Sequence, residues 1–438
     1  MLSVADFLYN LRMRKILLLF ALAFAAHGQS HFVTVARNQV LLDGKPYVFV
    51  GTNYWYGSLL PLEKDKKRGI KRLRRELNFL KKHGVTNLRL MAGAEGSGPM
   101  NGVTRVGPPL QPEQGKFDEN VIRGLDVLLA EMAKRDMKAV IFLSNNWEWS
   151  GGFQQYLIWN NVISPDLYTR KPDWDELRDV VAKFYTCEPC ISAYRKQVEF
   201  VITRTNSVNK RRYVDDPTIM AWELANEPRP MRPAANAAYL KWINESAAYI
   251  KSLDRKHLVT TGSEGWIGPV SNTIFKDSHS AANIDYLTIH IWPKNWGWFS
   301  PIERTKVTAY ENAVEHSRSY LAIHIADAAM LEKPLVVEEF GLPRDYYSYG
   351  AFTVPTSLRD KYYEFILSYI GNSTNVAGAN FWAFGGTARP IRGQPMWKLG
   401  DDRMGDPPME EQGLNSVFDT DASTWAVIDK FTKPTKKK

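Results

Sequence analysis

The sequence lacks any apolar run long enough to cross a lipid bilayer as a helix, which takes about 20 residues. Its longest apolar run, residues 16–26, is much shorter; Arg14-Lys15 precede it, and the small residues Ala26 and Gly28 stand at its end, before Gln29. This arrangement is typical of a secretory signal peptide. We therefore expect residues 1–28 to be a signal peptide, with Met13 as a possible true start. The mature protein should then be secreted or periplasmic, with no stable membrane partner; an uncleaved signal anchor is the alternative.

Cysteine is also scarce, since Cys187 and Cys190 are the only two. Two thiolates are too few for a structural zinc site, which has four protein ligands. A thioredoxin-type redox pair starts a helix that directly follows a strand, whereas this pair follows a long insertion. In an exported protein we expect the two cysteines to form a local disulfide that stabilises this loop.

The body of the chain has no large excess of one charge, although the formal net charge is +9. Residues 1–28 contribute +2 and the lysines of the basic tail, residues 433–438, contribute +4, which leaves +3 for the rest. Because nucleic-acid binding depends on clustered basic residues, we expect no nucleic-acid partner. After residue 28 the chain also has neither a His-x-x-x-His motif nor a Gly-rich phosphate loop. We therefore expect no metal and no organic cofactor.

What the chain does contain is an alternation of apolar strand patterns and amphipathic helix patterns. Strands are predicted at residues 47–53, 85–91, 138–143, 218–222, 257–261, 285–290, 334–341 and 378–384. Helices are predicted at residues 66–83, 118–135, 191–206, 234–253, 304–331, 357–370 and 422–431. A long insertion, residues 148–189, follows the third strand and is typical of a functional loop or lid.

This alternation, without sequence repeats or linkers, predicts one α/β domain over residues 29–432. Its expected fold is a single (β/α)8 TIM barrel with elaborated βα loops. The competing fold, a doubly wound sheet, would have a Gly-rich phosphate loop after the first strand. Asn53-Tyr54-Trp55-Tyr56 occupies that position instead.

Two glutamates stand at predicted strand ends. Glu227 follows the fourth strand in the motif Asn226-Glu227-Pro228, and Glu339 ends the seventh. Because all strand ends of a barrel meet at one rim, these carboxylates should face each other. Two carboxylates that flank a glycosidic bond are what acetal hydrolysis requires. The adjacent Glu338 complicates the assignment, because side-chain alternation allows only one of the two glutamates into the barrel.

Further polar residues stand at the same rim. Arg89 interrupts an apolar strand and needs an anionic partner there, such as the catalytic carboxylate. Asn226 and His290 can hydrogen-bond a carboxylate or a sugar hydroxyl. Each residue alone could have a purely structural role, but their coincidence at one kind of strand end favours a site. Four more residues near strand ends are candidates for substrate binding: Trp55, Asn146, Trp147 and Glu264.

The residues around the two glutamates resemble glycoside hydrolase family 5, of the clan of retaining (β/α)8 hydrolases. The similar motifs are Asn226-Glu227-Pro228 and Glu339-Phe340-Gly341. The endo-β-1,4-mannanases of that family, bacterial members most closely, are similar to this chain at residues 86–90, 145–147, 222–229 and 405–417. The resemblance covers nearly the whole mature chain.

The resemblance implies that Glu227 is the acid/base and that Glu339, rather than Glu338, is the nucleophile. It implies supporting roles at these positions: Arg89, Asn226 and His290. It also implies that Trp382 forms the floor under the sugar and that Arg229 contacts mannose on the leaving-group side. One position departs from the family pattern: His-x-Tyr is replaced by His290-Ile291-Trp292. We include Trp292 as a supporting residue, since its indole N–H can donate the bond of the missing phenol.

Together these observations predict a monomeric, retaining, endo-acting hydrolase of β-1,4-mannosidic bonds. Its expected partner is a β-mannan polysaccharide: mannan, glucomannan or galactomannan. An endo-glucanase and an exo-β-mannosidase of the same clan remain alternatives. A non-catalytic carbohydrate-binding barrel is the alternative from another functional class.

Overall fold

The computed structural model describes residues 32–300, 306–347, 354–371 and 375–433. The predicted signal peptide and residues 434–438 of the basic tail lie outside the described residues. Within the described ranges, no helix has both the length and the apolar character that a membrane span would need.

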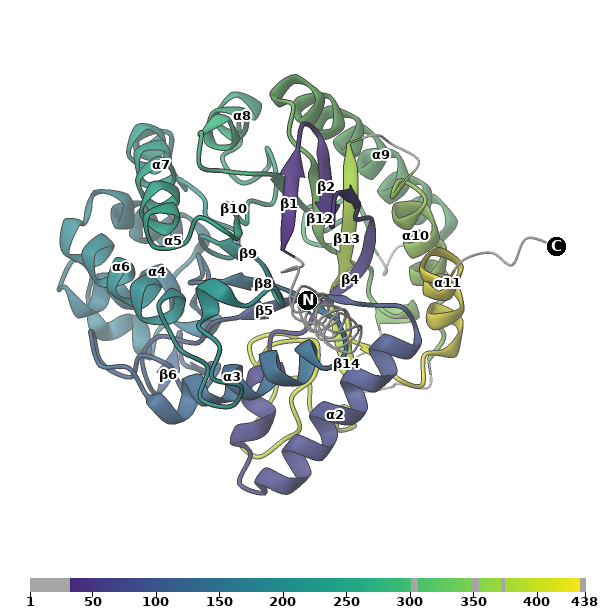
Figure 1. Cartoon of the computed structure of the whole chain (residues 1–438), viewed down its shortest axis with the longest axis horizontal. Coiled ribbons are helices and arrows are strands. Elements are labelled where there is room, and N and C mark those ends of the chain that lie inside the picture. The colour runs from purple at the N-terminus through teal and green to yellow at the C-terminus, as the bar shows by residue number, and fades with distance from the viewer. Residues whose placement is uncertain (1–31, 301–305, 348–353, 372–374, 434–438) are drawn as a thin grey trace, which may run out of the picture.

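Eight parallel strands form the central sheet, paired in the order β10-β9-β8-β5-β4-β13-β12-β11. In chain order they are β4 (Phe49–Asn53), β5 (Asn87–Met91), β8 (Lys138–Phe142), β9 (Ile219–Glu223), β10 (Leu258–Thr260), β11 (Leu287–Ile291), β12 (Leu335–Phe340) and β13 (Val376–Phe381). The two outer strands of this order also meet, because Asp285 N donates to Val259 O at 2.8 Å and His290 N to Glu264 O at 3.0 Å. These bonds close the sheet, and the predicted (β/α)8 TIM barrel is confirmed (Figure 1).

One helix follows each barrel strand, and together the helices surround the barrel (Figure 1). They are α2 (Lys66–Lys82), α3 (Glu119–Ala133), α6 (Glu188–Ile202), α7 (Asn236–Leu253), α8 (Asn272–Ser280), α9 (Lys306–Leu331), α10 (Ser357–Leu367) and α11 (Ala422–Thr432). Helix α8 was not predicted from the sequence. Its buried face consists of Phe275, Ser278 and His279, so it lacks the apolar periodicity that reveals a helix.

An N-terminal hairpin, also not predicted, closes one end of the barrel. Its strands are β1 (Val33–Ala36) and β2 (Gln39–Leu42), followed by the short β3 (Lys45–Pro46). Val33 and Val40 pack in one apolar cluster with residues of the barrel strands, among them Phe49 and Leu258. Figure 1 shows β1 and β2 lying over the barrel. Since Phe49 and Leu258 start their strands, the hairpin covers the amino-terminal end and leaves the carboxyl-terminal end for a site.

The insertion between β8 and α6 extends from the carboxyl-terminal end of β8. It contains α4 (Gly152–Trp159) and α5 (Trp174–Ala182). The expected disulfide between Cys187 and Cys190 is present and lies at the start of α6.

Candidate active site

Glu227 lies at the carboxyl-terminal rim of the barrel, four residues beyond the end of β9. Its backbone has a φ of 50°, in the left-handed region that residues other than glycine rarely adopt. Such a conformation costs on the order of 1–3 kcal/mol and persists only where neighbouring contacts impose it. Here Glu227 N donates to Gly262 O at 2.9 Å, and Asn226 N donates to Ser144 O at 2.9 Å. The loops after β8 and β10 thus fix the Glu227 backbone.

Glu339 is placed by a bulge in β12. The pairing with β11 skips Glu338, so that His290 lies opposite Glu339. The expectation that only one of the two glutamates enters the barrel is wrong, because alternation fails at a bulge. Glu339 Oε1 lies 2.5 Å from Arg89 Nη1, and Glu338 Oε2 lies 3.8 Å from Arg89 Nε. Glu339 lines the rim cavity, whereas Glu338 is buried and accepts a hydrogen bond from Tyr286 Oη at 3.2 Å.

Glu227 and Glu339 face each other at short range. One oxygen of each carboxylate and one ring nitrogen of His290 all lie within 4.8 Å of one another. Carboxyl groups about 5–5.5 Å apart are typical of glycosidases that retain the anomeric configuration, whereas inverting enzymes separate them by about 6.5–9.5 Å. The spacing therefore fits direct attack by one carboxylate on the anomeric carbon.

Arg89 connects Glu339 to the barrel interior. Its fully buried guanidinium donates to Glu223 at 2.8 and 2.5 Å, to Glu339 at 2.5 Å and to Asn226 Oδ1 at 2.7 Å. Burial lowers the pKa of Arg89, but the charges of Glu223 and Glu339 have the larger opposite effect. The pKa of Arg89 is therefore raised above its ordinary value, and the guanidinium stays charged. Arg89 thus has the anionic partners that its position in the sequence requires, and Glu223 has a structural role.

His290 lies between the two carboxylates. His290 Nδ1 is 2.6 Å from Glu227 Oε1 and 3.5 Å from Glu339 Oε2. Burial lowers the pKa of His290, but the two carboxylates raise it above its ordinary value. Burial alone would raise the pKa of Glu227. Two hydrogen bonds oppose this effect, one with His290 and one from Trp147 at 2.5 Å, and so do the charges of His290 and Arg229. Together they lower the pKa of Glu227 to about 2. Burial raises the pKa of Glu339 despite His290 and Arg89.

The two glutamates line a cavity of about 640 Å³ at the rim. The residues predicted for the site that line it are Trp147, Asn226, Glu227, Arg229, Glu264, Trp292, Glu339 and Trp382. Flat indole faces and carboxylates are the kinds of surface that suit sugar rings and hydroxyl groups. The sequence analysis did not identify several lining residues as part of the site, among them Trp149, Trp174, Trp296, Met409, Glu410 and Asn415.

Two predicted substrate-binding residues lie behind the cavity wall. Trp55 is 1% exposed, and its indole donates to Gly405 O at 2.8 Å. Asn146 is also buried, and its Oδ1 accepts from Arg229 N at 3.3 Å. Neither residue lines the cavity; each supports a segment that does. A strand-end position does not predict whether a side chain is directed into the cleft or beneath it.

Trp292 and Trp382 lie on the Glu339 side of the cavity. Trp292 Nε1 donates to Glu339 Oε2 at 3.0 Å, which is the bond expected of the indole at this position. The hydrogen bond lowers the pKa of Glu339. Trp382 directly follows β13, and its ring meets that of Trp292 edge-on, with centroids 6.0 Å apart. Both rings line the cavity together with Glu339.

The opposite wall contains a buried ion pair. Arg229 Nη2 donates to Glu264 Oε2 at 2.6 Å, and Arg229 Nε contacts the same carboxylate. Burial raises the pKa of Glu264 to about 7, although the charge of Arg229 lowers it. The guanidinium packs over the Trp147 ring, 4.8 Å from its centroid. Arg229 is therefore held by Glu264 and Trp147 beside Glu227.

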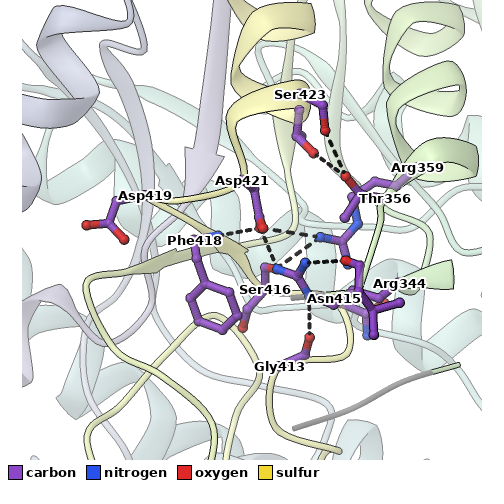
Figure 2. A network of polar contacts seen from close by, with 12 residues as sticks. Arg344, Thr356, Arg359, Gly413, Asn415, Ser416, Phe418, Asp419, Asp421 and Ser423 are labelled. Atoms are coloured by element: carbon purple, nitrogen blue, oxygen red, sulfur yellow. Dashed lines mark hydrogen bonds and ion pairs between the residues drawn. The ribbon is translucent and has the colours of Figure 1, made fainter. Parts of the chain in front are cut away.

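The C-terminal loop after β13 supplies a further wall, which includes Glu410 and Asn415. A buried polar network holds this loop from below (Figure 2). Arg359 donates to Leu342 O, Leu414 O and Ser416 O at 2.9, 2.6 and 3.0 Å. The loop is thereby attached to the segment that follows Glu339.

Among the described residues, one group of His and carboxylate side chains has metal-like spacing: Glu227, His290 and Glu339. The oxygens of both carboxylates are already engaged in hydrogen bonds. Arg89 and Trp292 donate to Glu339, and Trp147 and His290 bond to Glu227. This donor set suits carboxylates in acid–base and nucleophilic roles better than a cation site.

Comparison with known proteins agrees with this geometry. Residues 30–438 match the family described as "GH family 5 beta-mannosidase-like". The chain belongs to that glycoside hydrolase family.

Its relatives include mannan-degrading enzymes of plants. Mannan endo-1,4-beta-mannosidase 1 of Oryza sativa subsp. japonica is 31% identical over 336 residues, which cover 73% of this chain and 70% of the relative. Mannan endo-1,4-beta-mannosidase 4 of Solanum lycopersicum is 29% identical over 86% of this chain and 87% of its own. Among solved structures, the glycoside hydrolase family 5 mannosidase from Rhizomucor miehei is 33% identical with a TM-score of 0.81, covering 92% of this chain and 98% of that one.

Proposed function

We propose that the protein is a retaining, endo-acting hydrolase of β-1,4-mannosidic bonds in mannan, glucomannan or galactomannan. The observation that carries this proposal is the Glu227–Glu339 pair, with oxygens within 4.8 Å in a tryptophan-lined cavity. The names of the plant relatives support mannan as the substrate class.

In the first step Glu339 attacks the anomeric carbon while Glu227 protonates the departing oxygen. The bond from carbon to the leaving oxygen breaks as the ester bond to Glu339 forms. Arg89 and Trp292 direct hydrogen bonds at Glu339 and hold its oxygens in place. His290 Nδ1, 2.6 Å from Glu227 Oε1, is placed to exchange a proton with Glu227.

In the second step water hydrolyses the glycosyl–enzyme ester, and Glu227 acts as the base. The ester carries no charge, so Glu339 no longer disfavours the ionised form of Glu227. The proton of the water passes to Glu227, and Glu339 leaves as a carboxylate.

Exo-acting β-mannosidase activity is the second candidate. It is favoured by the likeness to the Rhizomucor miehei mannosidase, at a TM-score of 0.81 and 33% identity. An endo enzyme gives a ladder of products from mannohexaose, whereas an exo enzyme releases mannose alone.

We also propose that residues 1–28 are a signal peptide, that residues 29–432 form the catalytic domain, and that the enzyme is a secreted or periplasmic monomer. N-terminal sequencing of the exported protein and its mass in solution test these points. A retained leader or a stable dimer would contradict them.

Product analysis with four proteins tests the proposed function: wild type, Glu227→Ala, Glu339→Ala and Glu338→Gln. Substrates are mannohexaose, galactomannan and carboxymethylcellulose. The wild type should cut the first two, and Glu339→Ala should lose several orders of magnitude in rate. Azide should restore turnover of activated mannosides to both alanine variants, giving a β-mannosyl azide with Glu227→Ala and an α-mannosyl azide with Glu339→Ala.

Glu338→Gln is the matched control for the nucleophile. Burial and the charge of Glu223 raise the pKa of Glu338 well above its ordinary value, so glutamine mimics its neutral form. This variant should keep most of the activity. If Glu338→Gln is inactive while Glu339→Ala works, the nucleophile is misassigned. If glycan binding persists without turnover in the wild type, the protein is a binding barrel.

A further inference from the structure

Trp174 is a conspicuous side chain at the mouth of the cleft. It begins α5 in the insertion and is 52% exposed, yet it lines the same cavity as Glu227. Among the large hydrophobic side chains that are exposed in the described ranges, it is the only tryptophan. An exposed indole in a cavity wall is a flat apolar surface that is free for a ligand.

The position of Trp174 relative to the catalytic pair defines the side of the cleft on which it acts. Trp147 donates to Glu227, and the Trp147 and Trp174 rings lie 6.3 Å apart at 29° to each other. The Arg229 guanidinium packs against both rings, 4.8 and 5.9 Å from their centroids. Glu227 protonates the leaving oxygen, so this wall of aromatic rings extends outward on the leaving-group side. Trp292 lies beside Glu339 instead.

The segment that presents Trp174 is fixed in place. Asp173 caps α5, its side chain accepting from Glu176 N at 2.9 Å. Arg178 Nε donates to Met231 O at 3.0 Å, and Arg232 Nε bonds to Asp179 Oδ1 at 2.6 Å. These contacts join α5 to the segment that follows Glu227. The indole is therefore prepositioned, and little conformational entropy is lost when a sugar binds.

We propose that Trp174 is the platform of an outer sugar subsite on the leaving-group side, beyond the sugar next to the cleaved bond. This inference rests on the proposed function and specifies which substrates the enzyme prefers. A substrate that extends two sugars past the cleaved bond stacks on Trp174, whereas a shorter leaving group does not reach it. Trp174 thereby favours long β-mannans and fixes the register in which oligosaccharides bind.

The test compares kcat/KM on mannooligosaccharides of increasing length with kcat/KM on β-mannobiosyl fluoride, whose leaving group is one atom. The variants are Trp174→Ala and Trp174→Tyr. Trp174→Ala should lower kcat/KM about tenfold on mannohexaose, mainly through KM, with a much smaller loss on the fluoride. It should also shift the cleavage pattern of mannohexaose, and Trp174→Tyr should retain most of both properties. The control is Tyr369→Ala, an aromatic truncation beyond the end of α10, outside the cavity.

The outcomes separate this inference from the proposed function. Equal losses on the fluoride and on mannohexaose would mean that Trp174 only supports the fold of the insertion, and an unchanged length dependence would mean that it binds no sugar. Either result overturns the subsite while the wild type still cleaves mannan. A wild type that cleaves no β-mannoside overturns the proposed function itself.

Discussion

Asp419 and Asp421 offer a stringent test of how the C-terminal wall of the cleft is held. Asp421 Oδ2 lies 2.5 Å from Arg344 Nη2, and Asp419 Oδ1 lies 2.5 Å from Arg389 Nη2. The two contacts are equally short but differ in burial. The side chains of the first pair are 5% and 1% exposed, and those of the second are 26% and 29% exposed. Figure 2 shows Asp421 inside the network and Asp419 at its margin.

We expect Asp421→Ala to lower the free energy of unfolding by about 3–5 kcal/mol, since removal of one partner leaves a buried charge uncompensated. Arg344 loses its ion pair, and Arg359 Nη1, 3.9 Å from the same carboxylate, loses its nearby counter-charge. Phe418 N loses its acceptor at 2.8 Å. Asp421 makes no side-chain capping bond to α11, so a lost helix cap does not contribute. Asp419→Ala should cost about 0–1 kcal/mol, as partly exposed ion pairs do.

Urea unfolding followed by circular dichroism measures both variants against the wild type, at low and at high salt. High salt should remove most of the small Asp419 effect and little of the Asp421 effect, because buried pairs are screened less. Asp421→Ala should also lower kcat/KM on mannan, since the loop that carries Glu410 and Asn415 loses its support. Equal costs for the two variants would refute the reasoning that burial, rather than distance, decides the contribution of these pairs.

Two further substitutions test the pKa shifts of Glu339 and His290. Trp292→Phe keeps an aromatic ring but removes the donor to Glu339, so kcat/KM should fall roughly 10- to 100-fold, the worth of a hydrogen bond to a charged group. The acidic limb of its pH profile should move to higher pH, because that bond lowers the pKa of Glu339; an unmoved limb would contradict this effect of the bond. The pKa of His290 is raised in the folded state, so its stabilisation is full below its unfolded pKa of about 6.5 and is lost as pH rises through the folded value. His290→Ala should therefore cost more unfolding free energy at pH 5.5 than at pH 9, and a cost independent of pH would count against the charged His290–Glu227 contact.

The barrel was predictable because its pattern is local. Apolar strands of three to six residues alternate with amphipathic helices, and periodicity indicates both. Where the buried face of an element has few apolar residues, this periodicity is absent. The face of α8 contains Ser278 and His279, and the N-terminal hairpin is held to the barrel by only a few apolar residues such as Val33 and Val40. Neither has a strong periodic signal, so neither was predicted.

The residues of the site likewise include some whose position could be predicted from the sequence and some whose position could not. Glu227, Glu339 and Arg89 were predictable because the rim of a parallel barrel brings all strand ends together, whatever their distance in the sequence. Trp55 and Trp174 show the limit of that reasoning. Trp55 stands at a strand end but lies beneath the cleft, and Trp174 stands far from any strand yet reaches the cavity.

The sequence by itself determined the barrel, its catalytic end and the pair of glutamates, because hydrophobic periodicity and strand ends are properties of the chain. Only the tertiary structure decided which atoms meet there. The bulge in β12 directs both Glu338 and Glu339 inward, and the left-handed backbone of Glu227 depends on its bond to Gly262 from the neighbouring loop. Both features arise from pairing between strands distant in sequence, and no local pattern encodes that register.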